Sequence, residues 1–157
     1  MRAVIQRVSN SSVIVEHKIV ANIDAGLVIL VGITDSDQPE DSEYLAKKTL
    51  NMRLFPYDLE ETGFEQSAIE VGAQILVISQ FTLYASTRKG RRPSFTEASS
   101  SVNAEPLFEN LVFEFRKSGL DVHTGVFGAY MRVQLENSGP TTIVLDTADR
   151  HAPRHKS

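Results

Sequence analysis

Polar side chains stand where the most hydrophobic segment of the chain ends. The segment QILVIS runs directly into a short polar motif formed by Ser79, Gln80, Phe81 and Thr82. A strand that ends in hydroxyl and amide groups can aim them, with unpaired backbone N–H groups, at a developing oxyanion. The same residue types also end strands without any catalytic purpose. The motif alone therefore indicates either an oxyanion site or an ordinary strand end, with the ordinary end favoured.

A cluster of cations follows this motif in the chain. Its members are Arg88, Lys89, Arg91 and Arg92. The whole chain carries a net charge of −4, which argues against a protein that coats nucleic acid through its overall charge. A local cluster can still hold a phosphate backbone, and a solvated surface is the alternative. A second basic cluster near the C-terminus is assigned no function, and its cations are Arg150, Arg154 and Lys156.

A second polar interruption, NSGPTT, lies at residues 137–142. Gly139 allows close backbone approach, and Pro140 removes one N–H group. A cis peptide bond between them would present two carbonyl oxygens side by side, and such oxygens can recognise an ammonium group. An ordinary hairpin turn is the common alternative for a Gly-Pro pair, and it is favoured when these residues are taken alone.

The usual devices of hydrolases and nucleotide-binding enzymes are missing from the sequence. It has no cysteine, no G-x-S-x-G elbow, no phosphate-binding P-loop and no G-x-G-x-x-G motif. The histidines give no convincing metal site: His17 is expected on a hairpin surface, His123 in a strand, and His151 and His155 in the tail. We therefore predict an activity without a metal or cofactor.

The elements that must position these groups are mostly strands. Apolar alternation and short apolar runs predict strands at residues 3–8, 12–16, 19–23, 27–33, 53–55, 73–79, 121–124, 130–136 and 142–146. A turn is expected at residues 10–12 and an exposed loop at residues 57–66. Helical spacing predicts two helices, at residues 41–52 and 103–118, the second stopped by Gly119. The expected fold is mixed α/β, with mostly antiparallel sheets and two helices packed outside.

The 157 residues are most simply one domain, residues 1–147, followed by a flexible basic tail at residues 148–157. The longest apolar run, at residues 26–33, is much shorter than the roughly 20 residues that cross a bilayer. The N-terminus carries no apolar leader pattern. The absence of cysteine agrees with a reducing compartment, so a soluble, cytoplasmic protein without a membrane partner is expected.

Taken together, five segments resemble one enzyme family. The segments MRAVIQRVSNSSVIVE, VISQFTLYA, RRPSF, TGVFGAYMRVQLEN and NSGPTT occur in that order. They resemble the D-aminoacyl-tRNA deacylases, which cleave D-amino acids from mischarged tRNA. The likeness covers about residues 1–147, and the family's two signature motifs, SQFTL and N-x-G-P-x-T, are matched in full. The resemblance implies the family's barrel-like core. It also implies the D-specific branch of the family, because the related branch with a trans Gly-Pro turn carries different residues at both motifs.

The resemblance also implies functions for individual residues. It places Ser79, Gln80, Phe81 and Thr82 around the ester, with the Phe81 N–H as oxyanion donor. It assigns substrate contacts to Asn137, Gly139, Pro140, Thr142, Met131 and Arg7. Thr82 is either a nucleophile or a positioning group, with the tRNA's terminal 2′-hydroxyl assisting. We favour the second alternative, because the sequence offers Thr82 no general base.

The family's Gly-Pro turn is cis and enters the pocket of the partner subunit, which implies a homodimer. Its carbonyls would bind the α-ammonium group and exclude an L side chain, a form of selection by steric rejection. Arg7 would orient the turn. The 3′ acceptor end of aminoacyl-tRNA is then the expected partner, and glycyl-tRNA is expected to be cleaved as well. The alternative is a dimeric, non-catalytic module that binds tRNA ends or small amines.

Overall fold

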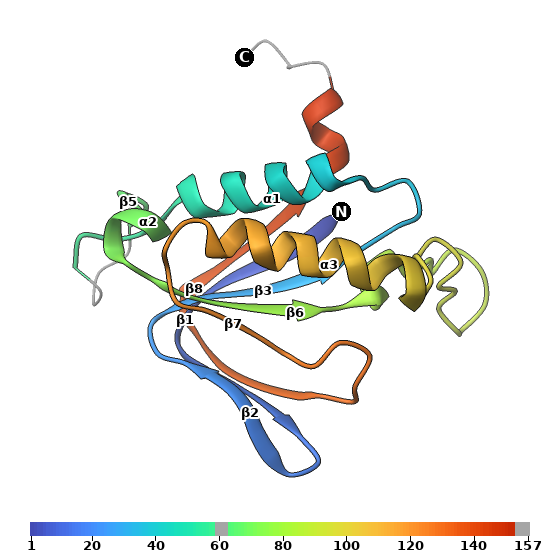
Figure 1. The fold of residues 1–157 in the computed structure, drawn as a ribbon, viewed down its shortest axis with the longest axis horizontal. Coiled ribbons are helices and arrows are strands. Elements are labelled where there is room, and N and C mark those ends of the chain that lie inside the picture. The colour runs from blue at the N-terminus through green and yellow to red at the C-terminus, as the bar shows by residue number, and fades with distance from the viewer. Residues whose placement is uncertain (59–62, 153–157) are drawn as a thin grey trace.

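The architecture is a mixed α/β fold built around a nearly closed, barrel-like sheet (Figure 1). A computed structural model describes residues 1–58 and 63–152. The strands in this part are β1 (Arg2–Val15), β2 (Lys18–Ile23), β3 (Gly26–Gly32), β4 (Arg53–Phe55), β5 (Gln66–Ser67), β6 (Gln74–Ser79), β7 (Val122–Thr124) and β8 (Arg132–Asp146). The helices are α1 (Pro39–Asn51), α2 (Ala68–Val71) and α3 (Ser101–Arg116), with 3-10 turns η1 (Phe81–Tyr84) and η2 (Thr147–His151).

Strand pairing explains the hydrophobic patterns of the sequence. The main sheet has the order β2-β1-β3-β6-β7, and β8 pairs with β1 along its other edge. Strand β1 is antiparallel to its three neighbours, whereas β3, β6 and β7 run parallel. The central strands β3 and β6 are covered on both faces, which is why they are almost continuously apolar.

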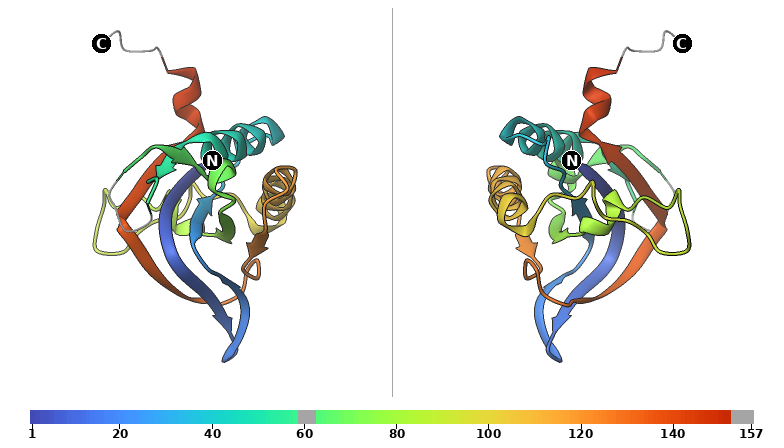
Figure 2. Two further views of the ribbon diagram at one scale, coloured as in Figure 1. Left: turned by 90° about the vertical axis from the view of Figure 1, so that its left-hand side faces the viewer. Right: turned by 90° about the vertical axis from the view of Figure 1, so that its right-hand side faces the viewer.

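Two hydrophobic clusters fill the two faces of the sheet. Helices α1 and α3 lie side by side on one face (Figure 2), and their apolar residues pack on Ile5, Ile29 and Val77 from the strands. The opposite, concave face holds a smaller cluster around Val28 and Leu76. Neighbouring residues of one strand thus serve different clusters, as the alternation of side chains along a strand requires. The expected barrel-like core with helices outside is confirmed.

The turn predicted at residues 10–12 is wrong, because β1 continues through it. Val8 pairs with Asn137 and Asn10 with Glu136, so Ser9 is the extra residue of a bulge. The bulge shifts the side-chain alternation of β1 and lets its polar centre stay paired. Ser11 Oγ, for example, donates to the Gln134 carbonyl at 2.8 Å.

The hairpin interpretation of residues 137–142 is also wrong. Gln6 pairs with Thr142 and Val8 with Asn137, so residues 138–141 stand opposite Arg7 alone. The chain on both sides runs in the same direction along β1, and the predicted strands at residues 130–136 and 142–146 belong to one strand, β8. The Gly-Pro segment is therefore a wide outward bulge of a single strand and not a chain reversal.

The two predicted helices exist with shifted ends, and a third, short helix was missed. Helix α1 begins at Pro39. Proline fits the first helical turn because N–H groups at that position have no intrahelical acceptor, so no hydrogen bond is lost. Helix α3 begins at Ser101, and Gly119 beyond its end has φ +79°. The four residues of α2 are bounded by Ser67 as N-cap and by Gly72 in the left-handed region.

The end of the described chain is tied to the fold. Within the segment expected to be a flexible tail, residues 148–151 lie in η2. Arg150 donates to the Glu40 carbonyl at 3.0 Å and pairs with Asp41 at 3.3 Å. The predicted basic residues Arg154 and Lys156, and His155, lie outside the described residues, as do residues 59–62 of the expected loop. None of the helices in the described segments is long and apolar enough to cross a membrane.

Candidate active site

The polar motif after β6 forms a 3-10 turn at the end of the sheet. Gln80 ends the strand with its N–H bonded to the Val31 carbonyl at 2.7 Å, and η1 begins at Phe81. The first N–H groups of a helical turn have no partner within the turn, and Phe81 is the first residue of η1, so the turn leaves its amide free for a ligand. Ser79 and Gln80 are half-buried, and Thr82 is exposed.

The motif opens onto a cavity of about 530 Å³. Ser79, Gln80 and Phe81 form one wall, and Met131 forms part of another, so the structure brings these four predicted site residues together. Thr82 lies beside them in η1 but is not a lining residue. The remaining lining residues come from β6, the end of β3, the start of α3, the connection between β7 and β8, and β8 itself: Ile78, Val31, Ile33, Ser99, Ser101, Ala104, Phe127, Gly128, Ala129, Tyr130 and Val133.

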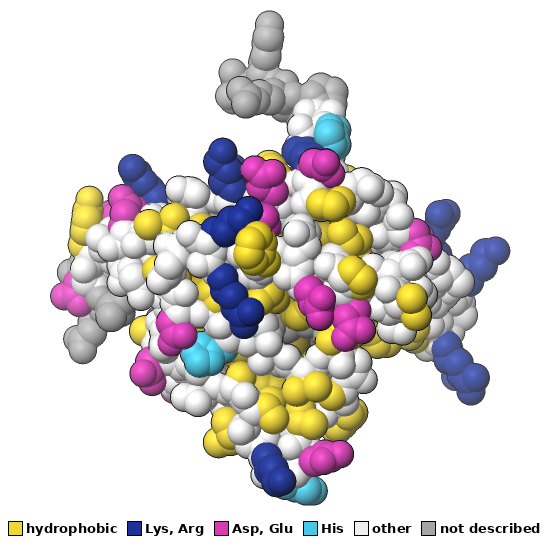
Figure 3. Space-filling model, in the orientation of Figure 1, with side chains coloured by type: hydrophobic (Ala, Val, Ile, Leu, Met, Phe, Trp, Pro, Cys, Tyr) yellow, Lys and Arg dark blue, Asp and Glu magenta, His cyan; other side chains and the backbone are white. Residues whose placement is uncertain are grey.

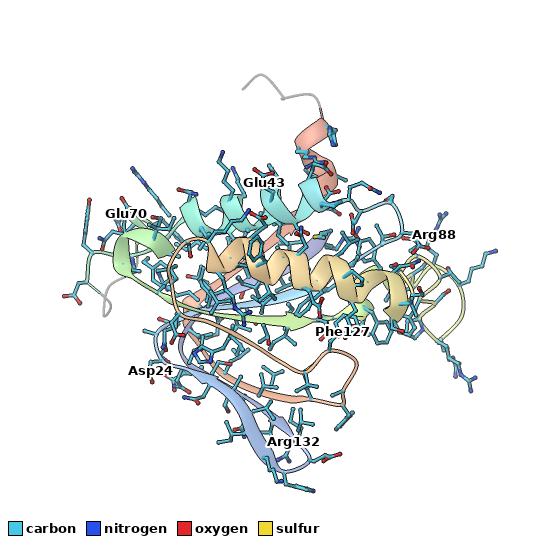
Figure 4. The ribbon with its side chains drawn as sticks, viewed as in Figure 1. Asp24, Glu43, Glu70, Arg88, Phe127 and Arg132 are labelled. Carbon is cyan, nitrogen blue, oxygen red and sulfur yellow. The ribbon has the colours of Figure 1, made fainter. Side chains whose placement is uncertain are left out.

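The cavity is mostly apolar, with a few polar groups at one end. Phe127, labelled in Figure 4, belongs to the connection between β7 and β8 that borders the cavity. On the surface, hydrophobic side chains gather below α3, around the same connection (Figure 3). An apolar chamber with a small number of convergent polar groups is the usual form of a small-ligand site. Here the polar end carries hydroxyl, amide and backbone donor groups.

Thr82 has no base among its hydrogen-bond partners. The Nε2 atom of Gln80 donates to Thr82 Oγ1, and an amide N–H group cannot take a proton from the hydroxyl. An unactivated hydroxyl is a weak nucleophile. The geometry therefore agrees with a positioning function for Thr82, in which Gln80 and Thr82 hold each other at the rim.

The basic loop is attached to the rim through an aromatic contact. Phe81 is 57% exposed, and its ring meets that of Phe95 edge-on, with centroids 5.1 Å apart. The loop between them is closed at its base by paired backbone bonds of Ser86 and Ser94. The four predicted cations are exposed in this loop, and Arg88 projects from the end of the molecule (Figure 4).

The Gly-Pro bulge has a dense set of hydrogen bonds behind it. The Gly139–Pro140 peptide bond is cis. The Nδ2 atom of Asn137 donates to the carbonyls of Arg7 and Thr141, each at 2.9 Å. Thr142 Oγ1 lies 3.4 Å from Asn137 Oδ1. The side-chain amide of Asn137 is thus bonded to backbone carbonyls and holds the backbone of the bulge in place.

Arg7 is buried beneath the bulge rather than exposed on a strand. It is 4% exposed, and its guanidinium donates to the carbonyls of Leu54 (2.7 Å), Gly63 (3.3 Å) and Ser138 (3.3 Å). Burial lowers the pKa of Arg7 from its ordinary value, and the charge of Glu65 opposes this shift. Three carbonyl acceptors on separate segments give the guanidinium one fixed orientation.

Gly139 is the point where the bulge touches this support. Its φ of +110° is in the region that favours glycine. A Cβ atom there would lie 2.5 Å from Nη2 of Arg7 and 2.9 Å from Oγ1 of Thr141. Conformation and space therefore both require glycine at this position.

Within one chain, the bulge and the cavity are separate. Val133 lines the cavity, and Gly139 lies six residues further along β8, or about 20 Å of extended chain. Neither Gly139 nor Pro140 lines the cavity, and Asn137, Thr142 and Arg7 surround the bulge instead. The predicted site residues thus form two groups at different places in the fold.

The three histidines within the described residues lie away from both groups. His17 is exposed in the β1–β2 hairpin with φ +64°. His123 is half-exposed on β7 with its Nε2 3.0 Å from Asp121 Oδ2, and this hydrogen bond lowers the pKa of Asp121. His151 accepts a hydrogen bond from Arg150. In the described residues no three His, Asp or Glu side chains are grouped as a metal site.

Sequence reasoning missed most of the apolar cavity wall. Phe127, Ala129 and Tyr130 come from the segment GVFGAYM, whose two glycines indicate an irregular connection but not what it lines. Ser99 and Ser101 flank the N-cap of α3, where serine has an ordinary structural use. Composition and periodicity give no signal that would have placed these residues at a common cavity.

Comparisons with known proteins agree on one family. The family model described as D-Tyr-tRNA(Tyr) deacylase matches residues 4–146. A D-aminoacyl-tRNA deacylase of Herpetosiphon aurantiacus is 50% identical over 149 residues, covering 95% of this chain and 96% of the relative. A relative with the same name from a Roseiflexus species is 49% identical over 156 residues, covering 99% of each chain.

A solved structure has a similar fold. The structure of a c-Myc DNA unwinding element binding protein has a TM-score of 0.85 to this chain at 36% identity. It covers 93% of this chain and 98% of its own. Because the family model spans nearly the whole fold and the relatives align over nearly their full lengths, this chain belongs to the D-Tyr-tRNA(Tyr) deacylase family.

Proposed function

We propose that this protein hydrolyses the ester bond of D-aminoacyl-tRNA and releases a free D-amino acid and tRNA. Its curated relatives carry the name of this activity. The observation that carries the proposal is the placement of Ser79, Gln80 and Phe81 on the cavity wall, at the first amide of η1. A cavity of about 530 Å³ has room for an aminoacyl ester and part of its nucleoside.

Hydrolysis of this ester depends more on stabilising the charge at the carbonyl oxygen and on positioning the ester than on a strong nucleophile. The Phe81 N–H donates to the ester carbonyl oxygen and stabilises the negative charge that develops when an oxygen nucleophile attacks. Water is the nucleophile: the carbonyl carbon gains a bond to the water oxygen and loses its bond to the ribose oxygen, and a proton from the attacking water passes to that ribose oxygen. The neighbouring 2′-hydroxyl assists, and Thr82 and Gln80 hold the ester in place.

Chirality is set by the Gly139–Pro140 bulge. Its carbonyl oxygens bind the α-ammonium group, and the backbone leaves no room where an L side chain would project. Rejection by a clash gives strong discrimination without any tighter contact to the D form. Glycine has no side chain to reject, so glycyl-tRNA is a second substrate of the same site.

The bulge acts across a homodimer interface. In its own chain it lies about 20 Å along β8 from Val133 of the cavity wall, so a second copy is needed to bring it there. The nearby strand face carries Val144, which is 68% exposed and pairs in register with Val4 of β1. The exposed apolar side chain of Val144, on the strand that carries the bulge, fits an interface between two copies.

The basic loop guides the tRNA backbone toward the cavity. Its cations project into solvent from a loop whose end, Phe95, contacts Phe81 at the rim. Contacts between cations and phosphates are independent of nucleotide sequence. A protein with a net charge of −4 can therefore bind tRNA through this local cluster of cations, without attracting it over its whole surface.

Hydrolysis of D-Tyr-tRNA, L-Tyr-tRNA and glycyl-tRNA tests the proposal. We expect release of D-tyrosine and glycine, little release of L-tyrosine, and no loss of rate in EDTA. Equal rates for both tyrosine enantiomers contradict the assignment of chirality. No release from D-Tyr-tRNA contradicts the activity itself and favours a module that only binds tRNA ends.

A further inference from the structure

Arg2, at the start of β1, holds the far end of the 3-10 turn that carries the proposed oxyanion donor. Its Nη1 atom donates to the carbonyl of Leu83 at 2.8 Å. Its guanidinium carbon lies 4.7 Å from the centre of the Tyr84 ring. Both contacts are made to η1, and the Arg2 side chain is 37% exposed. Neither the sequence motifs nor the proposed mechanism gives this arginine a function.

The turn has little to hold it in place by itself. Besides the bonding inside the turn, its ends make two short-range backbone bonds, from Leu83 N–H to the Gln80 carbonyl (3.2 Å) and from Ala85 N–H to the Thr82 carbonyl (3.1 Å). A single 3-10 turn is marginal alone, because each bond fixes several dihedral angles. The position of the Phe81 amide therefore depends on contacts between η1 and the rest of the fold.

Contacts with β3 hold the start and the middle of η1, and Arg2 holds its C-terminal end. The bond from Gln80 N–H to Val31 holds the start of the turn. Gly32 lies under its middle, where an added Cβ would be 3.0 Å from atoms of Leu83 and Tyr84. The end of η1 is held by Arg2 through the Leu83 carbonyl and the Tyr84 ring.

Arg2 is itself fixed by Asp146 at the end of β8. The two residues are paired in register, and Arg2 Nε donates to Asp146 Oδ2 at 3.1 Å. The other carboxylate oxygen accepts from Ala148 N–H at 3.0 Å, at the start of η2. The carboxylate thus cannot turn away from Arg2 without losing a bond. A continuous path of polar contacts links β8, β1 and η1.

We infer that Arg2 is a positioning residue for ester hydrolysis, held by Asp146, and that it sets the placement of the Phe81 amide against the substrate carbonyl. The inference rests on the proposed function, in which that amide is the oxyanion donor. A misplacement of about 1 Å at a reacting centre costs on the order of 100-fold in rate. Because Arg2 does not line the cavity, its loss should change the rate of the chemical step and leave substrate binding intact.

The test replaces Arg2 by methionine, which keeps the apolar stem over Tyr84 and removes the donors. Single-turnover cleavage of D-Tyr-tRNA should slow by about 10- to 100-fold. The dissociation constant for a non-hydrolysable D-tyrosyl-amide analogue of the tRNA end should stay within about twofold. Arg2→Lys should recover part of the rate, because an ammonium group can reach one acceptor but not both. Arg116→Met, at an exposed site on α3, is the control and should cleave normally.

Thermal unfolding separates positioning from stability. The rates are compared well below the melting temperature of each variant, per mole of folded protein. An unchanged rate for Arg2→Met, or a rate and an affinity that fall together, overturns the inference. If Arg2→Met does not fold, Asp146→Asn decides in its place: a slower chemical step with unchanged affinity supports the inference, and an unchanged rate overturns it. If the wild-type protein does not cleave D-Tyr-tRNA at all, the proposed function has failed instead.

Discussion

The end of η1 and the bulge of β8 are built in opposite ways. Around η1, the Phe81 side chain is more than half exposed, and its amide has no partner within the turn. Beneath the bulge, Arg7 is almost fully buried and donates to three backbone carbonyls, while Asn137 bridges two more. A group that stabilises developing charge must leave its donor free for substrate. A backbone segment that excludes a side chain must resist displacement, and the hydrogen bonds beneath the bulge provide that rigidity.

The largest effect is expected from removing the free donor of η1. Phe81→Pro deletes the backbone N–H, and proline fits the first position of a helical turn. Phe81→Ala is the matched control, because it loses the ring and keeps the N–H. We expect D-Tyr-tRNA hydrolysis by the proline variant to be about 10²- to 10³-fold slower than by the alanine variant. Equal rates would mean that this amide is not the oxyanion donor.

The next largest effect is expected at the Gly139–Pro140 bulge. In Gly139→Ala, the new Cβ would meet Arg7 Nη2 at 2.5 Å, and φ is +110°. The bulge must move, and we expect about a 100-fold loss in the ratio of D to L hydrolysis. Gly119→Ala is the control, since it has φ +79° but open space around it. If the two variants keep the wild-type ratio, the bulge does not select chirality.

The basic loop should affect binding and leave the chemistry unchanged. Replacing its four cations by glutamine should weaken binding of D-Tyr-tRNA and lower the slope of log K against log salt by about one for each phosphate that is no longer neutralised. Cleavage of D-tyrosyl-adenosine, which lacks the preceding phosphates, should not change. The control removes the same charge from exposed residues elsewhere: Lys47 and Lys48 of α1, Arg116 at the end of α3, and Lys117 just beyond it. Equal salt slopes for both variants would return the loop to a solvated surface.

The smallest effect is expected at Thr82. Its hydroxyl accepts from Gln80 and has no base, so Thr82→Ala should slow cleavage by no more than about 10-fold, as expected when one positioning hydrogen bond is removed. Serine at this position should be close to wild type. A loss above about 10³-fold in the alanine variant, recovered by serine, would make Thr82 the nucleophile.

The sequence predicted the strands of the sheet better than their connections. Continuous apolar runs identify β3 and β6, because both faces of these strands are covered. The bulges at Ser9 and at residues 138–141 could not be predicted, because polar and turn-forming residues mark a bulge and a hairpin alike. Only pairing with β1 shows that the chain does not reverse at Gly139–Pro140.

The residues of the candidate site also differ in how well the sequence predicts them. SQFT and NSGPTT are visible as short motifs, so their residues could be named from the sequence. Arg7 could be named only through a family likeness, since its acceptors on Leu54 and Gly63 come from distant segments. Arg2 gives no local signal at all, because its function depends on Asp146 and Leu83, which only the fold brings near.

We propose that chemistry and chiral rejection come from different subunits of one dimer. A heterodimer that combines one Phe81→Pro chain with one Gly139→Ala chain tests it directly. If the site is shared, one pocket of the heterodimer has an intact amide and an intact bulge, and about half of the wild-type, D-selective activity returns. If each chain builds its own site, both sites keep a defect, and the heterodimer is no more active or selective than the two homodimers.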